Sequence, residues 1–242
     1  MIKFYVSIIL LLYCETTFAQ QKKFFDSPFG AGGGYVPSII APNFSDINAK
    51  LKGFGIGDLP NGFYASGGAG YVYLGFIPGL RIGGIGIGGN TKQSALVKGF
   101  KNEIQYSASF GGFSVEYTLP YFRDFGVSLG IIIGGGMTSL DISRSKGSMD
   151  WDRVWNEVSD TASNASSFSR KLQNNYFLLT PTLNVDIPVH RLIALRVGTG
   201  YAFAFGETWK MDNDRELLNV PGSVKGGGLF ITTGIFFGFF SY

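Results

Sequence analysis

The sequence predicts an all-β fold: a closed antiparallel up-and-down transmembrane β-barrel of about eight strands, with short helices in two extracellular loops. Three observations predict it. Bulky apolar side chains alternate with small or polar ones at every second residue. Glycine, at 36 of 242 residues, is about twice its usual share, and charged residues are only 15%. Beyond the N-terminus no apolar run of about 18 residues follows, so the closed barrel is the remaining way to satisfy the backbone in lipid.

The N-terminal segment 1–19 has the pattern of a secretory signal peptide. Lys3 supplies a positive charge, and the apolar run 4–13 is too short to span a bilayer. Small residues at the positions that a signal peptidase reads predict cleavage after Ala19. We therefore expect 20–242 to form one outer-membrane β-barrel domain.

Cysteine content and charge exclude several classes of protein. Cys14 is the only cysteine, so the mature chain would contain no disulfide and no cysteine-based metal or catalytic site. A lipoprotein acylated at Cys14 is an alternative, although Tyr13 is bulkier than that processing site usually accepts. The net charge of +3 is spread along the chain without a basic block, so no nucleic-acid partner is expected.

The alternation of side chains is clearest in three segments, 125–138, 176–186 and 191–209. In each of them the odd positions are mostly bulky and apolar. The even positions are mostly glycine, alanine, polar or charged. This pattern is typical of strands that present one face to lipid and the other to a narrow lumen.

Connections of two kinds separate the predicted strands. Three contain a proline and are predicted to be tight turns, at 77–79, 119–121 and 187–189. Four are longer and more polar, near 38–61, 90–101, 145–168 and 211–225. Short and long connections alternate, which predicts strands at roughly 28–37, 62–76, 80–90, 102–118, 125–143, 170–186, 192–210 and 227–242. An even count places both termini and the short turns on the periplasmic side.

Two of the long connections are predicted to hold a helix. Ser45 can cap the first, which carries Ile47, Leu51 and Phe54 on one face and stops at the glycines of 53–55.

Ser148 can cap the second helix, with Trp151 and Trp155 among the residues of its apolar face. These faces would fold over the barrel rim. Alternatively, the two tryptophans would lie in the outer-leaflet interface.

Four charged residues, Arg81, Glu116, Asp186 and Arg196, form a predicted lumen charge cluster. Glu116, Asp186 and Arg196 share the inward parity. Arg81 shares it only if the glycines at 83–84 do not shift the alternation. A charge facing lipid near the midplane costs roughly 2–4 kcal/mol, which favours an inward pairing. Buried ions must pair, so the cluster is expected to plug the lumen.

The motifs that could carry chemistry lack the context that the chemistry requires. Ser128 matches a nucleophile-elbow pattern but lies inside an alternating strand, so it is expected to be a lumen hydroxyl. His190, the only histidine, lies in a predicted tight turn. The glycine pattern at 84–89 is followed by a polar segment rather than by a helix. No catalytic residue, metal site or cofactor is therefore predicted.

The C-terminus, 234–242, resembles the terminal strand of the small eight-stranded outer-membrane barrels of the opacity and OmpA-transmembrane-domain type. It ends on Tyr242 with Phe240 two places before it, and departs from the usual pattern at Gly234 and Gly238. The resemblance implies a Gram-negative-type outer membrane, recognition of Phe240 and Tyr242 by the assembly machinery, and contact with outer-membrane lipid. It also implies a possible gating role for the lumen charge cluster. Known enzymatic barrels of this membrane use a histidine near the outer leaflet, whereas His190 is expected at the opposite end.

These observations predict a non-catalytic outer-membrane protein, with a structural role or an interaction with an extracellular partner through its loops. One alternative is a narrow pore or small-ligand conduit, gated by the lumen charge cluster. A second is a lipid-active barrel enzyme. A soluble lipocalin-like protein would need polar outward faces, whereas the predicted strands at 125–143 and 192–210 present isoleucine, leucine and phenylalanine.

Overall fold

The computed structural model describes residues 30–122, 125–146, 151, 167–212, 214–222, 224 and 226–240. The expected signal peptide and the greater part of the second predicted helix lie outside these residues, as do Trp155 and Tyr242. Among the described residues, no helix is long and apolar enough to cross a membrane.

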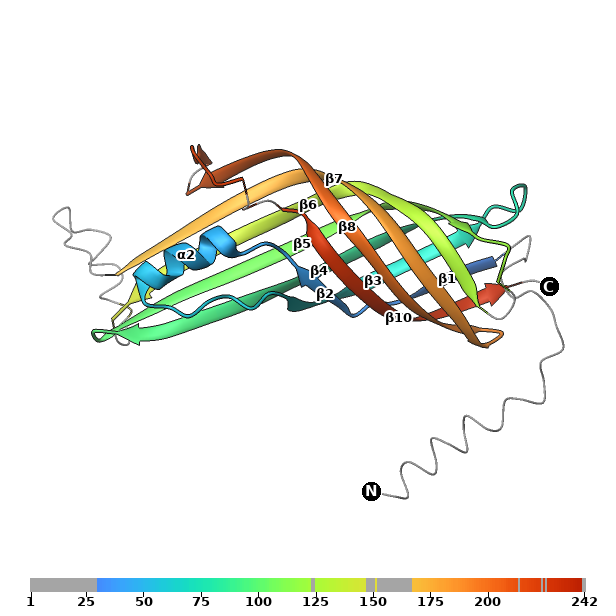
Figure 1. Cartoon of the computed structure of the whole chain (residues 1–242), viewed down its shortest axis with the longest axis horizontal. Coiled ribbons are helices and arrows are strands. Elements are labelled where there is room, and N and C mark those ends of the chain that lie inside the picture. Colours follow the sequence, from blue (N-terminus) through green and yellow to red (C-terminus); the bar gives the residue numbers. More distant parts are fainter. Residues whose placement is uncertain are drawn as a thin grey trace, which may run out of the picture.

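The strands form one antiparallel sheet that closes on itself (Figure 1). β1 (Gly30–Tyr35) and β2 (Ser38–Ala41) together occupy one position of the ring, because both pair with β10 on one side and with β3 on the other. The other positions are β3 (Phe63–Tyr73), β4 (Leu80–Val97), β5 (Phe100–Thr118), β6 (Gly126–Ser145), β7 (Phe168–His190), β8 (Ile193–Met211) and β10 (Gly228–Phe240). The short β9 (Arg215–Glu216) pairs only with the end of β8. The described chain thus forms a ring of eight strands, which confirms the predicted barrel.

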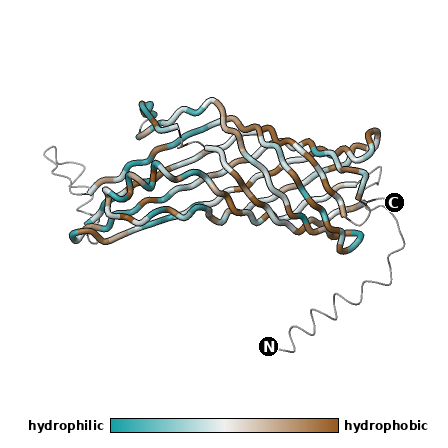
Figure 2. Tube along the Cα trace, viewed as in Figure 1, coloured by the Kyte–Doolittle hydropathy of each residue, from teal (hydrophilic) through white to brown (hydrophobic). Residues whose placement is uncertain are grey.

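The predicted alternation of faces is confirmed in the strands that suggested it. On β8, Val197 and Phe203 are exposed, whereas Ala194 and Ala202 are buried. The pairing of β4 with β5 is continuous, so the glycines at 83–84 do not shift the alternation and Arg81 faces inward. An outer surface of exposed isoleucine, leucine and phenylalanine side chains is unfavourable in water and suits hydrocarbon. Figure 2 shows these hydrophobic segments along the barrel wall, with hydrophilic ones frequent at the end where α2 lies.

The barrel wall is not equally high all round. β3 pairs with β4 only as far as Gly89, and β4 continues to Val97. On the other side, β10 pairs with β8 only as far as Ala202, and β8 continues to Met211. β4 to β8 therefore extend beyond the shorter strands β1, β2, β3 and β10 at one end of the barrel. This raised end is opposite to the tight connections at 74–79 and 191–192.

One predicted loop is wrong: residues 90–101 mostly belong to the hairpin of β4 and β5. The two strands pair up to Val97 and Phe100, which leaves Lys98 and Gly99 as a two-residue turn. Both residues have positive φ, 51° and 81°, as a type I′ turn requires. The polar residues that suggested a loop are strand residues of the raised wall. Short and long connections consequently do not alternate strictly.

Two prolines also lie differently from the prediction. Pro188 is not in a turn but within β7, which continues to His190 and is followed at once by β8. The expected strand at 28–37 is interrupted at Val36–Pro37 and resumes as β2. Because Pro37 has no N–H, it cannot take a full part in a ladder. Its carbonyl still accepts a hydrogen bond from the Thr233 N–H at 2.8 Å.

The first predicted helix is present as α2 (Ser45–Phe54), but Ser45 does not cap it. Phe44 occupies the cap position, and the Ser45 N–H donates to Asn43 Oδ1 at 3.0 Å. The helix ends at Gly55, whose φ of 75° places it in the left-handed region. Ile47 and Leu51 are buried against the barrel, as predicted for a helix whose apolar face folds over the barrel rim.

Candidate functional site

The lumen charge cluster is assembled from two cross-strand pairs. Arg81 on β4 stands opposite Glu116 on β5, and Asp186 on β7 stands opposite Arg196 on β8. All four side chains have the inward parity and are buried. The alternation of the strands therefore delivers two arginines and two carboxylates to the same level of the lumen.

The four charged groups form a closed cycle of ion pairs. Within the hairpins, Arg81 Nη2 lies 2.6 Å from Glu116 Oε2, and Arg196 Nε lies 2.6 Å from Asp186 Oδ1. Across the lumen, Arg81 Nη1 lies 2.8 Å from Asp186 Oδ2, and Arg196 Nη1 lies 3.4 Å from Glu116 Oε1. The cluster is electrically balanced. Each buried charge has two partners of opposite sign, as buried ions require.

Aromatic rings complete the surroundings of the two guanidinium groups. The Tyr71 ring contacts both of them, with its centroid 4.6 Å from Arg81 Cζ and 4.8 Å from Arg196 Cζ. Phe236 lies 4.6 Å from Arg196 Cζ. Arg81 also donates to the Ser128 hydroxyl, and to Tyr73 at 3.5 Å. These contacts fix the planes of both guanidinium groups, and Ser128 is thereby a buried lumen hydroxyl as expected.

Small residues leave the space that these long side chains occupy. A Cβ at Gly130, opposite Glu116, would lie 2.6 Å from the Cγ of that glutamate. A small cavity of about 30 Å³ lies beside the cluster, lined among others by Glu116, Arg196 and Thr182. The hydroxyl of Thr182 is buried and has no hydrogen-bond partner among the described residues. A cavity of this size and polarity can hold water.

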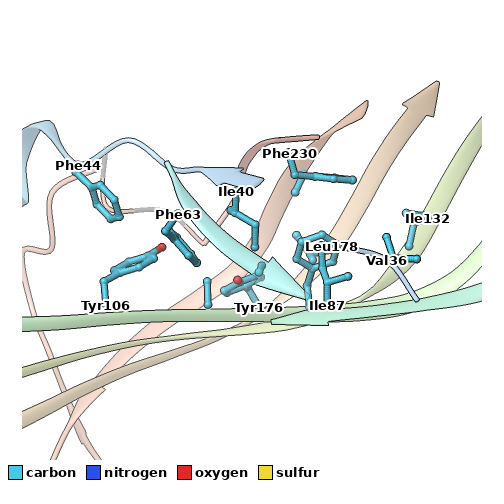
Figure 3. Packing of buried hydrophobic residues seen from close by; sticks show 14 of the residues in the cluster. Val36, Ile40, Phe44, Phe63, Ile87, Tyr106, Ile132, Tyr176, Leu178 and Phe230 are labelled. Carbon is cyan, nitrogen blue, oxygen red and sulfur yellow. The ribbon is translucent and has the colours of Figure 1, made fainter. Parts of the chain in front are cut away.

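Between the charge cluster and the raised end, the lumen is filled by apolar side chains. Figure 3 shows Phe63, Tyr106, Leu178 and Phe230 among the buried residues that converge inside the barrel. The rings of Phe44 and Tyr106 meet edge to face, with centroids 4.7 Å apart. Phe44 directly precedes α2, so the helix segment closes this end of the barrel.

The structure places the other predicted residues as follows. The backbone of Phe240 ends β10 opposite Gly30, whereas Tyr242 lies outside the described residues. The aromatics of β10 occur on both faces, since Phe236 is buried and Phe237 is exposed. Trp151 is exposed, and Trp155 is outside the described residues. His190 is exposed at the end of β7, where its Nδ1 accepts the Leu192 N–H at 3.4 Å.

Sequence reasoning missed Tyr71, Tyr73 and Phe236 as partners of the cluster. Their inward parity could be read from the alternation, but their closeness to the arginines depends on the register between strands, which pairs Tyr73 with Arg81 and Phe236 with Ala194. No group of three or more His, Cys, Asp or Glu side chains that could hold a metal occurs among the described residues.

Comparison with known proteins finds similarity only at the level of solved structures. No family model and no curated protein matches the chain. The outer membrane protein OprG of Pseudomonas aeruginosa is 10% identical and has a TM-score of 0.49, with 91% of this chain and 100% of OprG covered. A major outer membrane protein of Thermus thermophilus is 12% identical, at a TM-score of 0.46, with 87% and 99% covered. The protease OmpT of Escherichia coli is 10% identical, at a TM-score of 0.36, with 88% and 96% covered.

Proposed function

We propose that this chain is a non-catalytic barrel of the bacterial outer membrane that is closed inside and presents its raised wall and loops to an extracellular partner. The observation that carries the proposal is the double closure of the lumen. The charge cluster bridges the lumen from β4 and β5 to β7 and β8, and apolar side chains fill the raised half.

The outer surface supports the location. The outward residues of β6, β7, β8 and β10 are mostly apolar over a length of about ten residues, the length that a tilted strand needs to cross a bilayer. Beyond this band, the raised wall carries outward charged residues such as Lys92, Lys101 and Glu103. This change from apolar to charged residues supports an extracellular position for the raised wall.

Electrical recording tests the closed lumen. The refolded full-length mature chain, inserted in planar lipid membranes, should show no single-channel openings above the background of a protein-free membrane. Reproducible openings of a defined size would contradict a closed barrel.

Replacement of a loop tests the interaction role. Residues 148–159 are exchanged for a Gly-Ser linker of equal length, and the heat-modifiable mobility of the barrel on gels is checked. Cells producing this variant should lose adhesion to surfaces and to one another as fully as cells without the gene. Unchanged adhesion with the variant would argue against recognition through this loop.

A second candidate, a narrow conduit gated by the charge cluster, is favoured by one observation. The pair between Arg196 and Glu116 is the longest of the four, at 3.4 Å, and it lies beside the small polar cavity. If this pair is a gate, Glu116→Ala should raise the conductance of the barrel above that of the wild type. The absence of channel openings in recordings from both proteins would exclude the conduit.

A further inference from the structure

The outer wall of the barrel contains a row of four glycines, and at three of them no internal contact excludes a larger side chain. Gly68, Gly86, Gly111 and Gly135 are register partners on four adjacent strands, β3 to β6. They have the outward parity. A Cβ at Gly86 would meet no atom within 4 Å, and one at Gly135 would meet only a carbonyl oxygen at 3.5 Å. Inward glycines such as Gly134, by contrast, would bring a Cβ into collision with the backbone of the next strand.

The missing side chains leave a shallow groove on the outside of the barrel, which is widely open to the surroundings. It consists of two adjoining hollows of about 530 Å³ and 270 Å³, which share Gly88, Ser109 and Met137. The first hollow is lined by three members of the glycine row, and the second reaches Asn90 and Ser139. We call the two hollows together the outer-wall groove. At about 3.3 Å per residue, its course along β4 from Gly86 to Asn90 is roughly 13 Å long.

The groove is apolar at one end and polar at the other. Below the glycine row, the next outward residues are glycines on β3 and β4, and Phe113 and Ile133, both exposed, on β5 and β6. Above it, Asn90, Ser107 and Ser139 stand side by side on β4, β5 and β6. The groove therefore crosses from the hydrocarbon-facing band toward the level at which the barrel wall becomes hydrophilic.

Two ammonium groups stand on the wall above the polar end. Lys92 follows Asn90 as the next outward residue of β4, and Lys101 lies further up on β5. Both pair with the single carboxylate of Glu103, at 2.6 Å and 2.9 Å, so the three groups carry a net positive charge. The two ammonium groups hold the pKa of Glu103 below its usual range. About half of each lysine side chain remains exposed, so both can still bind an anion.

We propose that the outer-wall groove binds an anionic, phosphate-bearing lipid of the outer leaflet, with an acyl chain in the groove and a phosphate at Lys92 and Lys101. The inference rests on the proposed outer-membrane location. A groove that faces lipid is filled by hydrocarbon, and its polar upper end matches the junction between chain and headgroup. The cationic pair selects an anionic headgroup over a zwitterionic one, because each lysine near a membrane surface adds roughly 1 kcal/mol of attraction for anionic lipid.

Native mass spectrometry of the detergent-purified mature barrel tests the proposal, with lipid A as the anionic probe and phosphatidylethanolamine as the zwitterionic one. The wild type should retain lipid A and bind it at least tenfold more tightly than phosphatidylethanolamine. Gly86→Leu combined with Gly135→Leu fills the groove without an internal clash and should abolish the preference. Lys92→Ala combined with Lys101→Ala should weaken lipid A binding roughly tenfold and leave phosphatidylethanolamine binding unchanged.

Two matched controls separate the groove from general effects. Gly33→Leu adds the same side chain at another outward position, where a Cβ would make only ordinary van der Waals contacts, on β1 and outside the groove. Lys50→Ala combined with Lys52→Ala removes two charges from α2. Both controls should bind lipid A like the wild type. Equal binding by the groove variant and the wild type would overturn the proposal.

Other outcomes are also decisive. A wild type without preference for lipid A over phosphatidylethanolamine overturns the anionic-lipid site. A wild-type dimer that the groove variant converts to a monomer, with lipid binding unchanged, would show that a second copy of the chain occupies the groove. Heat-modifiable mobility on gels is recorded for every variant. A failure of the proposed function would appear separately, as channel openings or as unchanged adhesion of the loop variant, independently of lipid binding.

Discussion

Arg81 is fully buried and charged, and its guanidinium group contacts both carboxylates of the lumen charge cluster. Its removal would leave two carboxylates and one arginine in the lumen. A buried charge without compensation costs far more than the net gain of a satisfied pair. The cluster is therefore better understood as a condition for closing the barrel than as a source of extra stability.

Arg81→Ala should accordingly lower the free energy of unfolding by about 3–5 kcal/mol. The measurement is the urea midpoint of the barrel in liposomes, followed by tryptophan fluorescence and gel mobility. Lys92→Ala, which removes one partner of an exposed pair, should cost less than about 1 kcal/mol. Equal midpoints for the two variants would contradict the account of the cluster.

The ring and the hydroxyl of Tyr71 are expected to affect the stability of the barrel differently. The ring contacts two guanidinium groups, whereas the hydroxyl is buried without a hydrogen-bond partner among the described residues. Tyr71→Phe should therefore keep or raise the stability, and Tyr71→Leu should lose roughly 1–2 kcal/mol. Both variants are compared by urea unfolding in liposomes. A larger loss in the phenylalanine variant than in the leucine variant would show that the hydroxyl is the important group.

Among the elements, the hairpin of β4 and β5 shows how the raised wall is built. Its turn needs positive φ at two successive residues, yet Lys98 occupies the first of them. Lys98→Asn should raise the stability by a few tenths of a kcal/mol, and Gly99→Ala should lower it by about 1 kcal/mol. The urea unfolding midpoints of the two variants should therefore shift in opposite directions from that of the wild type. Shifts of the same sign would indicate another turn geometry.

α2 closes the raised end through its apolar face. Leu51 is buried against the barrel, whereas Lys52 is exposed on the same helix. Leu51→Ala should destabilise this end by about 2–5 kcal/mol and make the segment 42–62 sensitive to protease, with the membrane-spanning part still folded. Lys52→Ala serves as the control and should behave like the wild type. Resistance of 42–62 to protease in both variants would mean that Leu51 does not hold the helix in place.

The sequence predicts the faces of the strands better than their ends. A lipid-facing residue must be apolar and its neighbours must fit the lumen, so the parity of Arg81, Glu116, Asp186 and Arg196 can be read directly. Strand ends carry no such constraint above the membrane. The mostly polar residues 90–97 therefore looked like a loop, although they pair residue by residue with β5 and belong to a strand.

The partners of the cluster were less accessible to prediction. Tyr71 and Phe236 come close to the arginines only because the ring closes between β10 and the N-terminal strands. The stagger of the strands around a barrel cannot be predicted from the sequence of any single strand. Ser45 was mistaken for a helix cap because the true acceptor, the side chain of Asn43, lies two residues earlier.

For the whole molecule, closure and alternation have one common cause. In hydrocarbon every backbone polar group must find a partner within the protein, so the sheet has no free edge at the membrane level. Closure then creates an inside too narrow for anything but side chains. The charge cluster and the aromatic filling follow from this narrow interior.

Paramagnetic NMR of the folded chain tests this central claim most directly. The methyl-labelled mature chain is placed in nanodiscs with and without lipids that carry a spin label deep in the acyl chain. The account predicts strong broadening of the outward methyl groups of Leu195, Val197 and Ile231. It predicts much weaker broadening of the inward ones of Ile132 and Leu178. Equal broadening of both sets, or a folded chain that lipid leaves untouched, would contradict a barrel with a lipid-facing outer surface and a closed lumen.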